Sequence, residues 1–364
     1  AFWLNLAKDE ERAKKMIKEY YSRVELSNKY KVLKNNYFSS GEFSIVPIRY
    51  EDRMDIMQWR NEQVYHLRQA EPLTEESQEK YFKNVVVKLF EQEEPNQLLF
   101  SYLKNGSCIG YGGLVHINWV DRNAEVSFIM DTALEKIAFE KHWSNFLRML
   151  KKLAFGELNL NKIFTYAYNL RPHLYQVLEK NEFELTERKE KVLEVNGKWI
   201  DVLIHECDNP RNHLSLRNCI ANDMELVYNW SSDKLVREQS FNSEKINKEG
   251  HERWFATKLK SKNSLLFINE FKNESAGLVR FEIEEMNAVV GILIDKKFRG
   301  RGLSSLMLVK SAETYFETYE IPILAYIKES NVASIRAFEK AGFKFFKKAV
   351  VNDFPTLVYK LQKL

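Results

Sequence analysis

Apolar residues recur along the chain at the spacings of both strands and helices. Residues 265–268, 289–294 and 323–327 are apolar runs of strand length and composition. Residues 303–316 and 333–341 instead carry apolar positions at helical spacing. No apolar run approaches the ~20 residues needed to span a bilayer. We therefore expect a mixed α/β fold, in which the strands form one sheet flanked by helices.

A charge-rich segment comes first. Residues 5–34 place an apolar stripe at helical spacing, made up of Met16, Ile17, Tyr20, Tyr21 and Val24. This stripe predicts one or two helices, in a helical extension over residues 1–42. We interpret the extension as a packing element.

The rest of the chain repeats itself in order. An Asp lies seven residues before a Trp in both halves, as Asp52 with Trp59 and Asp223 with Trp230. Four further segments match in the same order, namely 73–82 with 246–255, 109–114 with 276–281, 124–131 with 288–295 and 178–183 with 338–343. The repeat predicts two similar domains, at 43–207 and 213–364, joined by the polar, Pro-containing residues 208–213.

Composition and charge exclude several classes. Of 364 residues, 45% are hydrophobic and 29% charged, which is typical of a globular protein. Lys plus Arg is 55 against 51 for Asp plus Glu, and this excess of +4 does not predict a nucleic-acid partner. We expect no membrane partner either. The three cysteines, Cys108, Cys207 and Cys219, have no metal-ligand spacing and form no disulfide set, so we expect no metal and a reducing compartment.

The sharpest local pattern is a basic turn between a strand and a helix. The strand ends at Asp295, and Gly300 and Gly302 precede the helix that begins near residue 303. Glycines let successive backbone N–H groups face one concavity, and a helix N-terminus adds free N–H groups and partial positive charge. The pattern predicts a site for a pyrophosphate-type anion, with Lys297, Arg299 and Arg301 raising the local positive potential. The alternative is a plain Gly-containing connection with solvated charges.

A second motif makes the pattern specific. K-x-x-G-x-G at 297–302 is followed by N-x-x-S-x-x-x-F-x-K-x-G-F at 331–343. Together the two motifs resemble the GNAT superfamily of N-acetyltransferases, with Lys297 where the family usually has Gln or Arg. The resemblance implies acetyl-CoA as cosubstrate, held by the backbone of residues 299–302, with Asn331 facing the pantetheine arm. The residues that it assigns to the coenzyme are Ile292, Ile294, Arg299, Gly300, Arg301, Gly302, Leu303, Ser304, Asn331, Ser334, Phe338 and Lys340.

The implied reaction is attack of an amine on a thioester. The amine must be neutral, so a base is required, and the oxyanion needs N–H donors, which we expect from strand 289–293. The base candidates are Glu282 and Glu284, which we expect on one strand face, and His251. Each has a structural alternative, a solvated strand face for the carboxylates and a surface or core position for the histidine. Phe338 stands where many relatives have a Tyr that protonates the thiolate, and Tyr326 is a candidate substitute or a buried aromatic.

The acceptor is expected at residues 230–243 and 251–255. These segments, with V-R-F-E at 279–282, resemble acetyltransferases of nucleotide-linked amino sugars on the way to nonulosonic acids such as pseudaminic acid. We expect Arg237 or Arg280 to pair with a diphosphate and Trp230 or Trp254 to stack on a base or sugar, with Ser240 beside them. The alternative is ordinary helix packing.

The first domain resembles the same group but lacks the turn. Residues 131–141 contain no Gly, and Glu135 stands where Arg299 stands in the second domain. An acidic side chain at an anion site is unfavourable. In the downstream motif Arg171 and Leu174 replace Asn331 and Ser334, while Gln78 replaces His251. We therefore expect weak or no coenzyme affinity in this domain, where Glu125 and Arg68 are the remaining polar candidates.

Two functions stay open at this point. The first is acetyl-CoA-dependent N-acetylation of a primary amine, which is a nucleotide-linked amino sugar or else a protein, a peptide or an aminoglycoside-like small amine. The second is a non-catalytic acyl-CoA-binding module, favoured by Phe338 and the altered first domain. The resemblance and the cysteine usage together imply a cytoplasmic protein.

Overall fold

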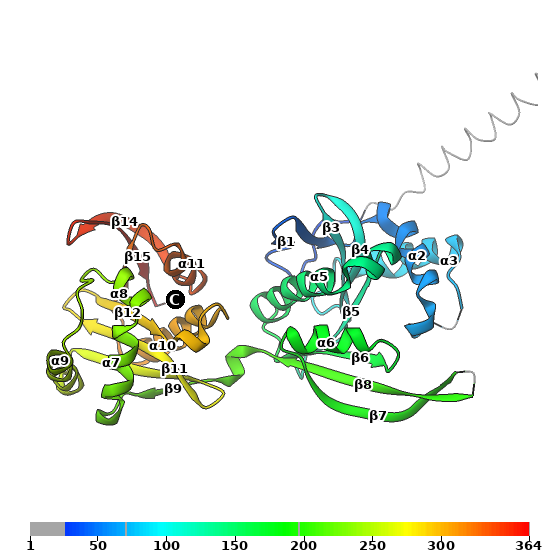
Figure 1. The fold of residues 1–364 in the computed structure, drawn as a ribbon. Helices are drawn as coiled ribbons and strands as arrows, with labels where there is room; N and C mark the ends of the chain where they lie inside the picture. The colour runs from blue at the N-terminus through cyan, green and yellow to red at the C-terminus, as the bar shows by residue number, and fades with distance from the viewer. Residues whose placement is uncertain (1–25, 70, 196, 364) are drawn as a thin grey trace, which may run out of the picture. The chain divides into compact units, whose positions relative to one another are not determined.

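The strands assemble into two separate sheets, each flanked by helices (Figure 1). The computed structural model describes residues 26–69, 71–195 and 197–363. The chain divides into two compact units, Ala1–Asn209 (unit 1) and Pro210–Leu364 (unit 2). Both sheets are mixed, so the predicted fold class is confirmed. In the described part, no helix is both long and apolar enough for a bilayer.

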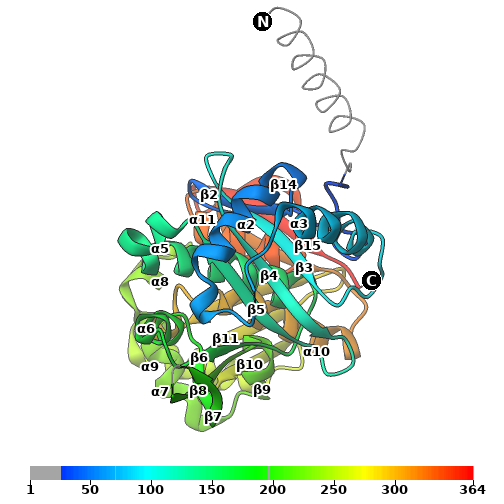
Figure 2. The ribbon, with the colours of Figure 1, turned by 90° about the vertical axis from the view of Figure 1, so that its right-hand side faces the viewer.

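Unit 1 is built on an eight-stranded sheet of order β1-β2-β3-β4-β5-β6-β8-β7. The strands are β1 (Phe38–Ser40), β2 (Phe43–Pro47), β3 (Leu98–Lys104), β4 (Ser107–Asn118), β5 (Asn123–Met130), β6 (Lys162–Tyr168), β7 (Glu184–Val195) and β8 (Lys198–Asp208). The helices are α2 (Arg53–Glu62), α3 (Glu75–Tyr81), α4 (Val87–Leu89), α5 (Thr132–Lys151) and α6 (Pro172–Lys180). Helix α2 lies over β5, as Figure 2 shows, and α5 packs along β1, β2, β4 and β5.

Unit 2 has a seven-stranded sheet of order β14-β15-β13-β12-β11-β10-β9. The strands are β9 (Leu214–Asn218), β10 (Ser264–Phe271), β11 (Glu274–Ile283), β12 (Ala288–Ile294), β13 (Ile323–Lys328), β14 (Lys344–Val351) and β15 (Phe354–Leu361). The helices are α7 (Met224–Ser232), α8 (Lys234–Gln239), α9 (Lys248–Lys260), α10 (Leu303–Thr318) and α11 (Val332–Lys340). The predicted apolar runs lie within β10, β12 and β13, and the predicted helices coincide with α10 and α11.

The two faces of the unit 2 sheet carry different cores. Val279 belongs to the core that includes residues of α10 and α11, while its strand neighbour Leu278 packs with residues of α7 and α9. Successive side chains of a strand point to opposite faces. From Leu278 onwards, the even-numbered residues of β11 therefore face α7 and α9, and the odd-numbered ones face α10.

The described part of the predicted N-terminal extension is not helical. Residues up to 25 lie outside the described ranges, while residues 26–34 form turns and bends rather than a helix. Tyr30 is fully buried, its hydroxyl donates to Leu99 O (2.7 Å), and its N–H donates to Asn36 Oδ1 (2.7 Å). This side-chain hydrogen bond to the backbone competes with helix formation, so the segment folds as part of unit 1.

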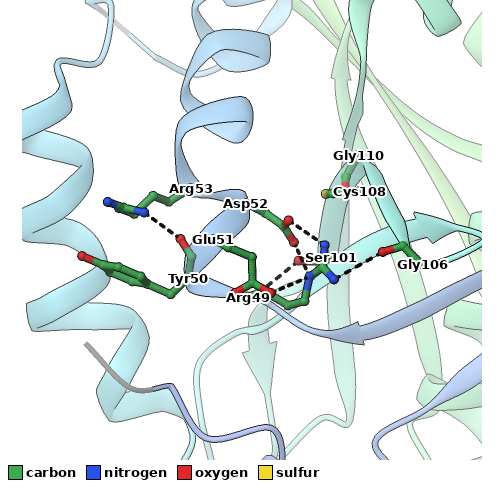
Figure 3. Close-up of polar contacts among 9 residues, drawn as sticks. All are labelled: Arg49, Tyr50, Glu51, Asp52, Arg53, Ser101, Gly106, Cys108 and Gly110. Atoms are coloured by element: carbon green, nitrogen blue, oxygen red, sulfur yellow. Dashed lines mark hydrogen bonds and ion pairs between the residues drawn. The ribbon is translucent and has the colours of Figure 1, made fainter. Parts of the chain in front are cut away.

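An Arg–Asp pair marks the same place in both repeats. Arg49 donates from Nε and Nη2 to the two carboxylate oxygens of Asp52, each at 2.7 Å, beside Cys108 of β4 (Figure 3). In unit 2, Arg217 binds the two oxygens of Asp223 at 2.7 and 2.8 Å. Each Asp is buried just before the first helix of its unit. The repeated Asp therefore fixes a strand end to a helix start through a bidentate ion pair.

Candidate functional site

Strands β12 and β13 separate after a short parallel contact. They pair only at Ala288 with Ile323 and at Val289 with Leu324, although β12 continues to Ile294. On its other side β12 stays paired with β11 along its whole length. Residues 290–294 thus offer one backbone edge with no strand partner in the described part of unit 2. Ile292 and Ile294 are half-buried on the α10 face of this edge.

The predicted turn follows directly. Asp295 Oδ1 accepts from the N–H of Lys297 (2.7 Å) and starts a short 3-10 turn at 296–298. Gly300 and Gly302 have φ of +77° and +75°, a left-handed backbone that glycine adopts without strain. Nothing lies within 4 Å of where a Cβ would stand at either glycine. The turn therefore leaves open space above both residues.

Helix α10 begins at Leu303 without a side-chain cap from any described residue. Its first N–H groups have no intrahelical partner and carry the positive end of the helix dipole. Leu303 is buried and anchors the helix start, whereas Ser304 is half-buried. The turn and the helix start together have the geometry that could hold an anion such as a pyrophosphate.

The three basic side chains predicted to raise the potential of the turn play different parts. Arg299 turns inward, pairing with Asp233 (2.8 Å) and donating from Nε to Ile294 O (3.2 Å). Lys297 pairs with Glu274. Arg301 lies over the Phe298 ring and has no carboxylate partner among the described residues. Arg299 therefore holds the turn in place, while Arg301 and the exposed Lys296 have no carboxylate partner among the described residues.

Helix α11 places the residues of the second motif. Asn331 caps the helix, its side-chain oxygen accepting from the N–H of Ser334 (3.1 Å). Phe338 is 3% exposed and packs edge-on against Phe343, so it is a core residue. Lys340 is exposed. For Asn331 and Phe338 the structure thus gives a stabilising role in the helix and the core.

The face covered by α7 and α9 brings several predicted residues together. Arg280 of β11 lies over Gly291 of β12, where a Cβ would stand 2.9 Å from its Nε. Its guanidinium carbon is 5.4 Å from the Trp254 ring centroid, and it makes no hydrogen bond or ion pair with the described residues. Burial lowers the pKa of Arg280. By strand alternation Glu282 and Tyr326 share this face.

The three base candidates end up in different surroundings. Glu282 Oε2 accepts from Lys258 Nζ (2.6 Å) and Ser264 Oγ (2.8 Å). Glu284 does not share its strand face, because β11 ends at Ile283 and Glu284 is exposed in the connecting turn, with its N–H bonded to Asn287 O (2.8 Å). The prediction that Glu284 shares a strand face with Glu282 is therefore wrong, because the strand ends one residue before Glu284.

His251 is buried among aromatic rings. It lies 5.4 Å from Tyr228 and 5.2 Å from Trp254, centroid to centroid. Neither ring nitrogen has a hydrogen-bond partner among the described residues. Burial lowers the pKa of His251, so the imidazole is neutral near pH 7. This placement agrees with the core alternative.

The other predicted acceptor residues are used by the fold itself. Arg237 donates to the carbonyls of Asn242 and Glu244, and Ser240 Oγ donates to Val236 O (2.7 Å). Trp230 Nε1 donates to Asp295 Oδ2 (2.7 Å) and ties α7 to the end of β12. Arg280 is thus the predicted acceptor cation whose guanidinium stays without a hydrogen-bond partner in the described part of unit 2.

Sequence reasoning missed two positions of this site. Gly291 makes room for Arg280, and a glycine in the middle of a strand signals such a close approach. Lys328 is 6% exposed and donates to Glu238 O (3.0 Å), which fastens β13 to the end of α8. No local pattern reveals Lys328, because its partner is distant in sequence.

Unit 1 replaces the turn with helix. Helix α5 starts immediately after Asp131, whose Oδ1 accepts from the N–H groups of Ala133 (2.8 Å) and Leu134 (3.2 Å). Residues 132–137 are helical, and only Ala138 is non-helical before the helix resumes. A carboxylate of the chain thus occupies the helix start that is open in unit 2.

An ion pair also joins the start of α5 to the start of α6. Arg171 pairs with Glu135 at 2.7 Å, and both side chains are almost fully buried. Leu174 is buried nearby, and Gln78 donates to Arg53 O (2.8 Å) as a structural residue. The charge at Glu135, predicted to oppose an anion, instead neutralises Arg171.

Comparisons with known proteins bear on both units. A family model described as "Acetyltransferase (GNAT) domain" matches residues 45–204, and a second with the same description matches residues 213–344. No curated protein matches the chain.

Solved structures match single domains. A spermidine N-acetyltransferase from Vibrio cholerae in complex with CoA and spermine is 18% identical, covering 47% of this chain and 97% of that chain with a TM-score of 0.41. The aminoglycoside acetyltransferase AAC(6')-Ib in complex with ribostamycin and coenzyme A is 18% identical, covering 41% and 93% with a TM-score of 0.38.

Proposed function

Since the chain belongs to the GNAT acetyltransferases, with one such domain in each unit, we propose that unit 2 acetylates the amine of a nucleotide-linked amino sugar. The observation that carries the proposal is the open turn at 296–302 followed by the uncapped start of α10. Unit 1 lacks this arrangement, so one coenzyme is bound per chain.

The residues of unit 2 fit acetyl-CoA. The N–H groups of residues 299–304 hold the pyrophosphate, and Arg301 adds its charge. The pantetheine arm follows the open edge of β12, whose backbone groups at residues 290–294 serve as hydrogen-bond partners. Acetyl-CoA supplies the thioester carbonyl, and N–H groups of the same edge stabilise the oxyanion.

The base is Glu282 in this proposal. Lys258 and Ser264 hold its Oε2 and orient the carboxylate, while Oε1 makes no hydrogen bond with a described residue. His251 is a poorer candidate, because both of its nitrogens are buried. Tyr326 lies on the same face as Glu282 and is the proposed donor to the leaving thiolate.

Arg280 decides between classes of acceptor. A polycationic amine would bring positive charge against a half-buried guanidinium that has no ion-pair partner among the described residues, at roughly 1–4 kcal/mol per charge pair at 4 Å. A diphosphate would pair with it and could do so bidentately. The site therefore favours an amine that carries an anionic group, as a nucleotide-linked amino sugar does.

The test is acetyl transfer by the full chain, followed as release of free coenzyme A. We expect kcat/KM for a nucleoside-diphosphate-linked amino sugar to exceed that for spermidine or kanamycin by at least about tenfold. The Gly300→Val/Gly302→Val double variant should lose acetyl-CoA affinity in calorimetry. The matched control Arg148→Gln, on the exposed surface of unit 1, should retain it.

Three results would contradict parts of the proposal. Faster turnover of spermidine would reject the anionic acceptor. Tight acetyl-CoA binding without turnover on any amine would favour the non-catalytic module. Unchanged coenzyme affinity in a folded double-glycine variant would reject the turn as the pyrophosphate site.

A further inference from the structure

One amine of the chain already lies at the base proposed for unit 2. Lys258 Nζ, on α9, is 2.6 Å from Glu282 Oε2 of β11. An acceptor amine that gives its proton to Glu282 must come within about 2.6–3.2 Å of this same carboxylate. Lys258 therefore holds a position of the kind that an acceptor amine has to take.

This amine also lies near the open edge of β12. Glu282 pairs with Val289, which in the described part of unit 2 is the last β12 residue paired with β13. The open edge at residues 290–294 begins at the next residue, and one strand residue spans about 3.3 Å. The Lys258–Glu282 pair thus lies beside the end of the edge to which the thioester is assigned.

The pair is accessible as well as fixed. The Lys258 and Glu282 side chains are 28% and 27% exposed, and the Ser264 hydroxyl holds the same carboxylate oxygen. Lys328, on the same sheet face by strand alternation, is different. It is 6% exposed, lies over the Phe354 ring at 3.7 Å and donates to a carbonyl, which takes no proton. Lys258 is therefore the lysine of this face that has both a base and access to a ligand.

We propose that unit 2 acetylates its own Lys258. Glu282 takes one proton from the Lys258 ammonium, and the neutral nitrogen attacks the thioester carbonyl carbon of acetyl-CoA. The C–N bond forms and the C–S bond breaks. The second proton lost by the nitrogen goes to the coenzyme sulfur, and Glu282 releases the first to water. This inference rests on the function proposed for unit 2, because it takes Glu282 as the base.

Acetylation changes the surroundings of the base. The product at Lys258 is a neutral amide with a single N–H, so Glu282 loses its cationic partner. The carboxylate is then left with Ser264 as its charge-neutral donor, and an incoming amine no longer competes with the Lys258 ammonium. Modification of Lys258 thus opens the base to an acceptor.

The experiment is incubation of the full chain with acetyl-CoA and no acceptor, followed over time by tandem mass spectrometry of its peptides. We expect Lys258 to be acetylated at least about tenfold faster than Lys260. Lys260 is exposed on the same helix and therefore reports the uncatalysed reaction. Glu282→Gln keeps the side-chain shape but takes no proton, so the rate at Lys258 should fall at least about tenfold. The matched control Glu285→Gln, exposed in the connecting turn, should leave that rate unchanged.

The Gly300→Val/Gly302→Val variant gives a second test that leaves the Lys258–Glu282 pair intact. Because it should lose acetyl-CoA affinity, its rate of acetylation at Lys258 should fall to the rate at Lys260. Equal rates at the two lysines of the unaltered chain, or an unmodified Lys258, would overturn the proposal. An unchanged rate at Lys258 in Glu282→Gln would overturn it too.

The same chain is then given the nucleotide-linked amino sugar. Transfer to this acceptor with Lys258 unmodified would reject the inference and leave the function proposed for unit 2 standing. Acetylation of Lys258 without transfer to the acceptor would support the inference and reject that acceptor.

Discussion

Arg280→Met should make unit 2 more stable and less active. Arg280 is half-buried over Gly291 and makes no hydrogen bond or ion pair with a described residue. A fully buried unpaired charge is unfavourable by several kcal/mol and a half-buried one by a part of that, while the contact with Trp254 stabilises by about 0.5–2 kcal/mol. Met keeps the apolar stem and removes the charge. We therefore expect a gain of about 1–3 kcal/mol in the free energy of unfolding.

Differential scanning calorimetry measures this gain. For a unit of about 150 residues, 1 kcal/mol corresponds to roughly 2–4 °C, so the transition of unit 2 should rise by roughly 2–12 °C. That transition is identified as the one that acetyl-CoA shifts upward. Arg301→Met, which removes an exposed arginine, is the control and should change stability by no more than about 0.5 kcal/mol.

Activity should move in the opposite direction. Loss of a charged hydrogen bond of about 1.5–3 kcal/mol lowers kcat/KM for the nucleotide-linked acceptor about 10- to 100-fold, with affinity for acetyl-CoA unchanged. A destabilised Arg280→Met would refute the reasoning, because it would mean that the fold itself satisfies the guanidinium. An equal loss of activity with spermidine would refute the assignment of Arg280 to an anionic group.

Further predictions concern both units. Val at Gly300 or Gly302 forces a β-branched residue to a left-handed φ, at about 1–2 kcal/mol of strain, and should weaken coenzyme binding about tenfold or more in calorimetry. Burial and the nearby Arg171 lower the pKa of His66 to about 3. The unfolded chain therefore binds the extra proton below about pH 6.5, and unit 1 should lose up to about 1.4 kcal/mol of stability per pH unit as the pH falls towards 3. His66→Gln should reduce this slope in urea titrations at pH 5–7, and an unchanged slope would contradict the assignment. Arg171→Met leaves Glu135 buried and unpaired, so denaturant titration should show a loss of about 3–5 kcal/mol; a loss below about 1 kcal/mol would mean that Glu135 finds another partner.

Local patterns predicted what local physics decides. The apolar runs correctly predicted β10, β12 and β13. The two glycines predicted the turn before α10, since glycine adopts a left-handed φ without strain. The absence of glycine at 131–141 similarly predicted an altered turn in unit 1.

Ion pairs between residues far apart in sequence could not be predicted. Arg299 was predicted to raise the positive potential of the turn, but the fold brings Asp233 to it. Glu282 was a candidate base with no known neighbour, and Lys258 is its partner across the sheet face. Each side chain has several opposite charges within its reach along the chain, so only the packed structure selects one.

The end of a strand was the other source of error. The alternation through Phe281 and Ile283 gave no reason to stop before Glu284. The bond from Glu284 N–H to Asn287 O closes a turn there instead. Such a turn depends on how long the paired strand β12 is, and a single strand's pattern does not contain that length.

Seven residues follow the matching aspartates in each unit, 132–138 after Asp131 up to the kink in α5 and 296–302 after Asp295 up to the start of α10. In unit 1 that segment has grown into helix, and in unit 2 it has not. Each glycine disfavours helix by about 1 kcal/mol relative to alanine. Gly300 and Gly302 therefore prevent α10 from extending towards its N-terminus over the proposed anion site. A few substitutions at these glycines would therefore let α10 extend over the turn and abolish coenzyme binding there, without any change in chain length.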